Sequence, residues 1–204
     1  MQLAWNQNHI ILAGTAGAPP APSHENHGIT YFQFPLRVRR LSGTEDTLNV
    51  VAAQELLQVC PVEPEMELTV EGEVRSYNNR SGTGSRLIIT VLARALERGG
   101  PAHKNELTLA GVLCKPPIVR RTPLGREICD MMLAVNRKYG RADYLPCIAW
   151  GGLAVWCGQL GVGDGIRLSG RLQSREYTKE SGGQSARRTA YEISIMSLEP
   201  VEKA

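Results

Sequence analysis

The chain contains an internal repeat of about 100 residues, and this repeat limits the possible folds more than any other feature of the sequence. The segment Asn8–Gly14 (NHIILAG) returns 97 residues later as Asn105–Gly111 (NELTLAG), and a Pro-Pro pair follows each copy. The same offset aligns Arg40 with Arg137. A register shared over about 90 residues is the mark of a duplicated structural unit. The sequence therefore predicts two homologous domains.

We place these domains at residues 1–98 and 104–200, on either side of a short segment rich in Gly and Pro within residues 97–102. Inside each repeat apolar and polar residues mostly alternate, for example over residues 66–74 and 166–172. A period of two predicts half-buried β-strands.

Two further features favour a small closed barrel. Gly72 and Gly170 lie inside predicted strands, where a glycine indicates a bulge or a sharp bend. One helix-like stretch per repeat, at residues 54–59 and 152–160, follows the third predicted strand. We therefore predict an all-β protein of two tandem OB-folds, each a five-stranded barrel with a short helix between the third and fourth strands.

The composition excludes several classes of protein. A chain of 204 residues with 42% hydrophobic content can bury a core, so it is neither disordered nor fibrous. No apolar run approaches the roughly 18 residues of a membrane span, and the first residues lack the pattern of a signal peptide, so we expect a cytoplasmic protein. The five cysteines include no C-x-x-C pair, which favours reduced, mostly buried thiols over disulfides or a zinc cluster.

The formal net charge of +3 is unevenly distributed along the chain. Residues 1–102 carry a net charge of −2, whereas residues 103–204 carry +5. A protein that holds a phosphate backbone needs a positive surface. We expect such a surface on the second repeat.

Three segments of the second repeat carry a family resemblance. They are residues 133–137 (LAVNR), 142–151 (ADYLPCIAWG) and 168–177 (LSGRLQSREY). In this order and at these separations they resemble the bacterial single-stranded DNA-binding protein family, over about 95 residues from Asn105 to Glu199. The first repeat is similar to that family only through the second. The resemblance implies an OB-fold that binds single-stranded DNA. The residues show no convincing pattern of an enzyme active site or a metal site, so we expect no enzymatic activity, no metal and no cofactor.

Binding a single strand without reading its sequence requires aromatic faces on which bases stack. The resemblance places these aromatics at four positions of the second repeat: Tyr139, Tyr144, Trp150 and Tyr177. Tyr144 and Trp150 are six residues apart, so along one strand they face the same side of the sheet. For these two residues a place in the core is the alternative.

Basic residues are interleaved with the four aromatics and complete the predicted interface. They are Arg137, Lys138, Arg141, Arg171, Arg175 and Lys179. Any one of them could be a solvated surface charge. Together with the aromatics they favour nucleic-acid binding, since lysine and arginine neutralise phosphates and an arginine can also stack on bases.

The first repeat has lost the four stacking positions. In their place it has Ser42, Thr47, Ala53 and Asn79. It carries aromatics elsewhere, namely Trp5, Tyr31, Phe32, Phe34 and Tyr77. Two alternatives stay open for these aromatics: a shifted nucleic-acid surface, or a place in the core and at interfaces.

We predict that the protein binds single-stranded DNA with little sequence preference, in replication, recombination or repair. The alternative is a protein-interaction or assembly module, a primosome-like or mobile-element accessory factor with weak nucleic-acid binding. The near-neutral total charge and the altered first repeat favour this alternative, whereas the intact aromatic set of the second repeat favours direct binding.

The resemblance also bears on partners. Members with one OB-fold per chain assemble as tetramers, so a chain with two OB-folds is expected to form a homodimer with four. The family commonly carries an acidic tail that docks repair and replication proteins. The chain ends with Val201-Glu202-Lys203-Ala204 shortly after the last predicted strand, so we expect no such tail here.

Overall fold

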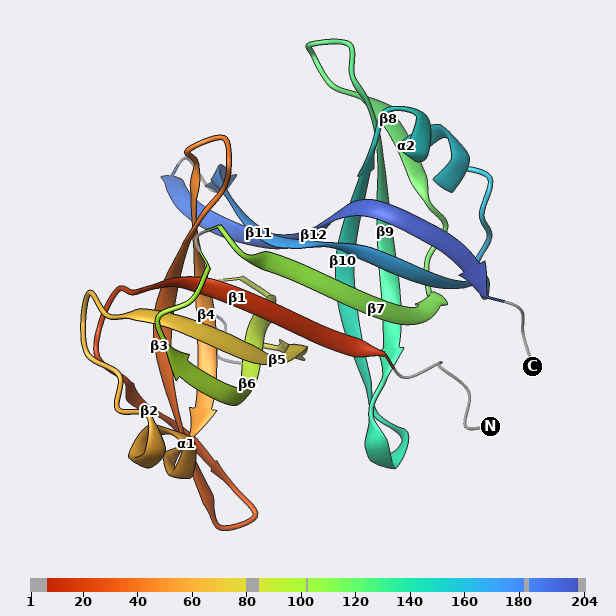
Figure 1. Cartoon of the computed structure of the whole chain (residues 1–204). Helices are drawn as coiled ribbons and strands as arrows, with labels where there is room; N and C mark the ends of the chain where they lie inside the picture. The colour runs from red at the N-terminus through yellow and green to blue at the C-terminus, as the bar shows by residue number, and fades with distance from the viewer. Residues whose placement is uncertain (1–6, 80–84, 102, 182–183, 202–204) are drawn as a thin grey trace. The chain divides into compact units, whose positions relative to one another are not determined.

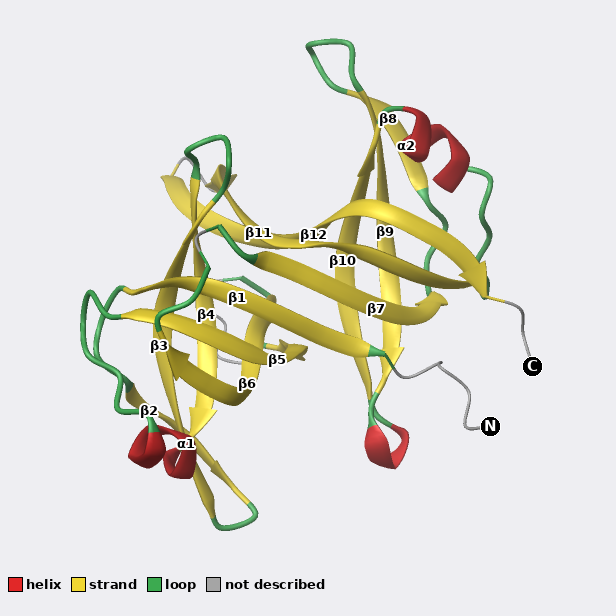
Figure 2. Ribbon diagram, in the orientation of Figure 1, coloured by secondary structure: helices red, strands yellow, loops and turns green. Residues whose placement is uncertain are grey.

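The protein is built almost entirely of β-strands, with a few short helices (Figure 2). The computed structural model describes residues 7–79, 85–101, 103–181 and 184–201. In this part of the chain no helix is long and apolar enough to cross a membrane.

The chain divides into two compact units. The larger unit comprises Met1–Asn8, Ser76–Ile88 and Leu107–Ala204, and the smaller unit comprises His9–Arg75 and Ile89–Glu106. The segment Ser76–Ile88 of the first repeat therefore belongs to the larger unit. The domain limits expected from the sequence stay a prediction.

The first repeat forms a small barrel (Figure 1). Its elements are β1 (Asn8–Ala16), β2 (Ala21–Asn26), β3 (Ile29–Arg39), β4 (Glu45–Ala53), α1 (Gln54–Val59), β5 (Glu67–Asn78) and β6 (Leu87–Arg98). The strands follow the order β2-β3-β4-β6-β5-β1, and a further pairing of β1 with β3 closes the barrel. The pairing of β4 with β6 is parallel.

The second repeat forms the same barrel. Its elements are β7 (Asn105–Leu113), β8 (Ile118–Arg121), β9 (Glu127–Asn136), the 3-10 helix η1 (Lys138–Gly140), β10 (Ala142–Trp150), α2 (Gly152–Cys157), β11 (Gly165–Ser181) and β12 (Gln184–Val201). The order is β7-β11-β12-β10-β9-β8, with β7 also paired to β9 and β10 parallel to β12. The predicted tandem OB-folds are confirmed.

Two details differ from the prediction. Each repeat has six strands instead of five, because the arm that precedes the first hairpin turn forms an edge strand of its own, β2 or β8. The helix α2 ends at Cys157, three residues before the predicted end, and Gly158 caps it by donating its backbone N–H to the carbonyl oxygen of Ala154. A glycine at the end of a helix lowers the stability of the helix little, because the helix stops there.

One face of β10 forms a wall of the core in the larger unit. Its residues Asp143, Leu145, Cys147 and Ala149 are buried, and Leu145 lies opposite the equally buried Leu133 of β9. Burial of each such aliphatic side chain contributes about 1.5–3 kcal/mol. On the opposite face Tyr144 and Trp150 are exposed, whereas Ile148 between them is buried.

Glycines stand where strands of one barrel approach each other closely. A Cβ atom at Gly111 in β7 would clash with the carbonyl oxygen of Ala134 in β9, and one at Gly170 in β11 would clash with a carbonyl oxygen of β12. Gly14 and Gly72 meet the same constraint in the first repeat. The register of β11 against β12 shifts at Gly170, which confirms the bulge predicted there.

Candidate nucleic-acid interface

The strand β10 presents two aromatic side chains on its outward face. Tyr144 is 51% exposed and Trp150 is 40% exposed. Their direct partners on β9 are Ala134 and Ile128, and Ile128 is buried. The alternative that Tyr144 and Trp150 are core residues is therefore wrong. Two exposed rings on one strand face give a surface on which flat apolar groups can stack.

A third predicted aromatic, Tyr177 on β11, lies beside a cation. The guanidinium carbon of Arg175 is 5.8 Å from the centroid of the Tyr177 ring, within the range of a cation–π contact. The same guanidinium lies 4.0 Å from the carboxylate of Glu192 on β12. The ring is half-buried, and its strand partner in β12 is Arg188.

Two of the predicted site residues have side chains outside the part that the structure describes. The backbone of Tyr139 lies in η1 and that of Lys179 in β11. At the two ends of η1, Lys138 and Arg141 are exposed. Their charges lie within a few residues of Tyr144 in the chain.

Arg137 is held by a buried carboxylate. Its Nε donates to Oδ2 of Asp143 at 2.6 Å, and a guanidinium nitrogen also donates to Oδ1 of the same side chain. Asp143 is fully buried. A buried charge is tolerated only when it is paired and hydrogen-bonded. Arg137 thus stabilises the start of β10, and a contact with nucleic acid stays a prediction for it.

The first repeat contains the same ion pair. Arg40 donates from Nε and Nη2 to the carboxylate of Asp46 at 2.7 and 2.6 Å, and Asp46 is fully buried. The repeat register places Arg40 opposite Arg137 and Asp46 opposite Asp143. Because the pair persists where the stacking aromatics have been lost, it belongs to the architecture of each barrel. The shared arginine was the sequence signal for this role.

Arg171, a further predicted site residue on β11, lies in a polar network. Arg171 donates to the side-chain oxygen of Gln173 at 3.4 Å, and Gln173 donates to Glu192 at 2.9 Å. Gln173 is buried, and the carboxylate of Glu192 is mostly covered. An acidic side chain therefore lies among the basic residues of the predicted interface.

Two aromatics of the first repeat differ in burial, and a shifted nucleic-acid surface stays a prediction. Phe34 is buried in the core. Tyr31 is half-buried and stacks on His24, with ring centroids 4.9 Å apart and ring planes 7° from parallel. Tyr31 pairs across the strands with Ala53, the position that corresponds to Trp150. Trp5 lies outside the described residues.

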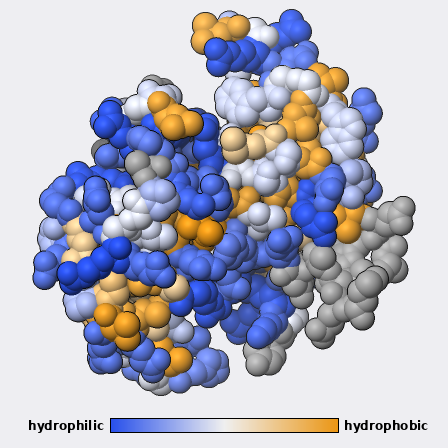
Figure 3. Space-filling model, viewed as in Figure 1, coloured by the Kyte–Doolittle hydropathy of each residue, from blue (hydrophilic) through white to orange (hydrophobic). Residues whose placement is uncertain are grey.

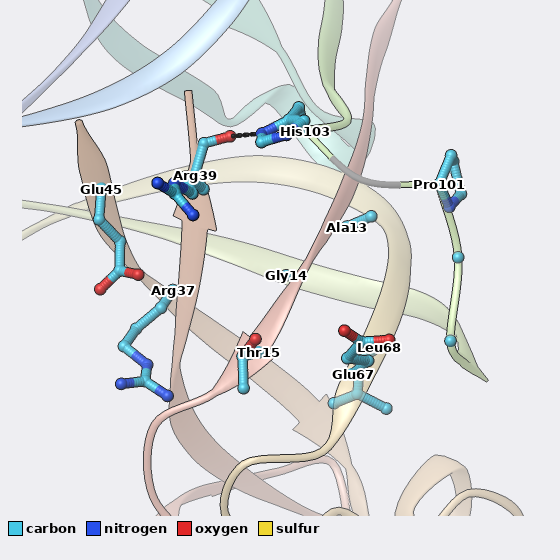
Figure 4. A pocket seen from close by; sticks show the side chains of 12 residues that line it. Ala13, Gly14, Thr15, Arg37, Arg39, Glu45, Glu67, Leu68, Pro101 and His103 are labelled. Carbon is cyan, nitrogen blue, oxygen red and sulfur yellow. Dashed lines mark hydrogen bonds between the residues drawn. The ribbon is translucent and has the colours of Figure 1, made fainter. Parts of the chain in front are cut away.

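A pocket of about 470 Å³ lies in the smaller unit (Figure 4). Arg37, Arg39 and Glu45 line it from β3 and β4, and His103 at its rim donates from Nδ1 to the carbonyl oxygen of Arg39 at 3.0 Å. Arg37 is also paired with Glu65 at 2.5 Å. Positive and negative side chains are balanced here, so the pocket does not concentrate the positive charge that a phosphate backbone needs.

All five cysteines are free thiols, and four of them are buried. Burial raises the pKa of the Cys147 thiol and raises that of Cys157 to about 12, so both stay protonated at neutral pH. Within the described residues no three His, Cys, Asp or Glu side chains are grouped so that they could hold a metal ion.

Comparison with known proteins agrees with the geometry of the second repeat. The profile of the single-strand binding protein family matches residues 104–201. A single-stranded DNA-binding protein of Thermus thermophilus is 38% identical over 92 residues, which are 42% of this chain and 35% of that protein. One of Deinococcus radiodurans is 23% identical over 89% of this chain and 72% of its own length.

The crystal structure of the wild-type single-stranded DNA binding protein from Thermus aquaticus has a TM-score of 0.81 to this chain, at 23% identity, and the match covers 98% of this chain and 96% of that one. This likeness shows the fold. The chain spans about a third of the length of the Thermus thermophilus relative. It covers 75% of single-stranded DNA-binding protein B of Bacillus subtilis, at 34% identity. Together with the aromatic face of β10, these matches show that the chain belongs to the single-strand binding protein family.

Proposed function

We propose that the protein binds single-stranded DNA with little sequence preference, and that it acts by non-covalent binding and not as an enzyme. The observation that carries this proposal is the pair of exposed rings, Tyr144 and Trp150, on one face of β10. Every base has a flat π-face, so stacking on such rings tolerates any sequence. The named relatives are single-stranded DNA-binding proteins, which supports the same ligand.

The basic residues near these rings provide the electrostatic part of the binding. Lys138 and Arg141 are exposed beside β10, and Arg175 lies at the ring of Tyr177. Cations at these places attract the phosphates while the bases stack. The stacking rings and the cations are all carried by the larger unit, which also has the more positive half of the sequence.

Titration of the pure protein tests this function. We expect oligothymidylate to quench the fluorescence of Trp150 and to bind more tightly than a duplex of equal length, at each of two salt concentrations. Equal affinity for the duplex would contradict the proposal, because paired and stacked bases cannot reach the rings.

We further propose that the chain forms a homodimer with four OB-folds and works on DNA in the cytoplasm, at the nucleoid. Several barrels on one strand raise the apparent affinity, because each later contact is intramolecular. Light scattering at micromolar concentration tests the assembly. The dimer predicts about twice the 22.3 kDa of one chain, and the mass of a single chain contradicts it.

A second candidate function is that of a protein-interaction module. The observation that favours it is a set of exposed apolar side chains on β8 and α2, among them Ile118, Val155 and Trp156. On the visible face, apolar patches lie among hydrophilic residues (Figure 3). If this function holds, substitution of Trp150 leaves partner binding intact and substitution of Trp156 removes it.

A further inference from the structure

The segment Ser76–Ile88 is anchored inside the larger unit by one buried serine. The backbone N–H of Ser76 donates to the carboxylate of Asp143 at 2.5 Å, and Arg137 donates to the carbonyl oxygen of Ser76 at 2.8 Å. The hydroxyl oxygen of Ser76 accepts the backbone N–H of Tyr144 at 2.7 Å. Ser76 thereby binds Asp143, Arg137 and Tyr144 through its backbone N–H, its carbonyl oxygen and its hydroxyl oxygen.

The loss of any of these hydrogen bonds would be unfavourable, because each of them involves a buried group. Asp143 is fully buried and Ser76 is 7% exposed, so water cannot replace a lost partner. A buried polar group that loses its hydrogen-bond partner is unfavourable. A second bond anchors the other arm of the segment, since the hydroxyl of Ser85 donates to the carbonyl oxygen of Thr189 at 3.4 Å. Both arms of the segment are therefore fixed to the larger unit.

The anchored arms carry an aromatic and a cation. Tyr77 follows Ser76 directly and is 48% exposed, and Arg86 on the other arm is exposed. The arms are joined by a hydrogen bond from the backbone N–H of Asn79 to the carbonyl oxygen of Arg86, at 2.8 Å. Among the described residues Arg86 has no ion-pair partner. The two arms therefore carry both kinds of group that single strands require, an exposed ring and an exposed cation.

The repeat register explains why this aromatic was not recognised as a site residue. Asn79 corresponds to the stacking position Tyr177. Tyr77 lies in β5, two residues before Asn79, which directly follows that strand. The first repeat has thus kept an aromatic on this arm, displaced by about 7 Å along the strand from the position that the family pattern indicates.

We propose that the two described arms of this segment, residues 76–79 and 85–88, are part of the single-stranded DNA interface of the larger unit. In it Tyr77 stacks on a base, Arg86 binds a phosphate, and Ser76 is a positioning residue that holds Tyr144 and the pair of Arg137 and Asp143. This inference rests on the proposed function, because it names further residues for the same ligand. It makes the interface a product of both repeats.

Binding measurements on full-length variants test the contact residues. Tyr77→Ala should weaken the affinity for oligothymidylate by about 5- to 150-fold, the range for one stacked base. Arg86→Gln should lower the slope of log affinity against log salt by about 0.7, the loss of one phosphate contact. The matched controls Tyr31→Ala and Arg98→Gln, both in the smaller unit, should change neither quantity.

Ser76 is tested by a readout that needs no DNA. Ser76→Ala removes the acceptor of the Tyr144 amide, so hydrogen exchange at that amide should become faster by at least about tenfold, an effect of the size of one lost hydrogen bond. Ser76→Thr keeps a hydroxyl and should restore both the protection and the affinity. Unchanged exchange in a folded Ser76→Ala protein overturns the positioning role.

The outcomes separate this inference from the proposed function. If the wild-type chain fails to bind oligothymidylate, both are overturned. If the wild-type chain binds and Trp150→Ala weakens it, while Tyr77→Ala and Arg86→Gln behave as wild type, only the role of the segment is overturned. Loss of affinity in Tyr77→Ala together with unchanged Tyr31→Ala supports it.

Discussion

The two repeats share a barrel but differ on its surface, and the difference separates what the fold needs from what binding needs. Both repeats keep the buried pair of arginine and aspartate and the glycines at the closest strand approaches. Only the second keeps exposed aromatics on its third OB strand, at Tyr144 and Trp150. Features present in both copies therefore belong to the architecture of the barrel. The exposed aromatics, which are present on this strand in one copy, indicate ligand binding.

The largest effect should come from breaking the shared ion pair. Asp143→Ala leaves Arg137 without its buried partner, and we expect it to lower the free energy of unfolding by about 3–5 kcal/mol. Asp46→Ala should cost a similar amount, because Arg40 loses the same contact. Urea unfolding measures both.

A surface pair is the control for this experiment. Glu127→Ala breaks only the exposed contact with Arg121 and should cost less than about 1 kcal/mol. A large cost for Asp143→Ala with none for Asp46→Ala would break the comparison, since it would make the pair a feature of one repeat alone.

The next effect concerns the feature that the repeats do not share. Trp150→Ala should weaken binding of oligothymidylate by about 1–3 kcal/mol, because one stacked base is lost. Trp156→Ala is the matched control, since this tryptophan of α2 is exposed to a similar degree, 38% against 40%, but lies outside the β10 face. Equal losses in the two variants would contradict the assignment of the site to β10.

The salt dependence of binding tests which basic residues contact the phosphates. Lys138→Gln and Arg141→Gln should each lower the slope of log affinity against log salt by about 0.7, because each removes one phosphate contact. Arg39→Gln, at an exposed position of the smaller unit, should leave the slope unchanged. A similar decrease for Arg39→Gln would show that the smaller unit also holds the backbone of the strand.

The smallest effect should appear at high pH, in the thiols of the second repeat. Burial raises the pKa of Cys157 from 9.0 to about 12, so the stability that this thiol contributes is complete below pH 9 and is lost as the pH rises toward 12. Relative to Cys157→Ser, the wild-type protein should therefore lose stability over this interval. Thermal unfolding at pH 8 and pH 10.5 measures the difference, and parallel curves for the two proteins would contradict it.

The sequence predicted the fold well because each barrel is encoded locally and twice. Alternating apolar residues, the mid-strand glycines and the helical stretch before the fourth OB strand all occur in both copies, so each copy supported the other. The edge strands β2 and β8 were not predicted, because all their residues are exposed and show no alternation of apolar and polar residues.

The site was less predictable, since its contacts join residues far apart in the chain. Tyr144 and Trp150 could be recognised from their spacing on one strand. Ser76 could not, because it is 67 residues away from Asp143 and serine is common in loops. Arg137 was grouped with the cations of the interface because charge alone does not show which arginine a buried carboxylate holds.

The carboxylate of Glu192 affects how strongly DNA binding depends on ionic strength. It lies 4.0 Å from the guanidinium of Arg175 and so acts as a counterion supplied by the protein itself. When a phosphate takes the place of such an internal counterion, no ion is released into solution at that position. The affinity of this protein should therefore be less sensitive to ionic strength than its number of cations suggests, and a bound strand would persist across a wider range of ionic conditions.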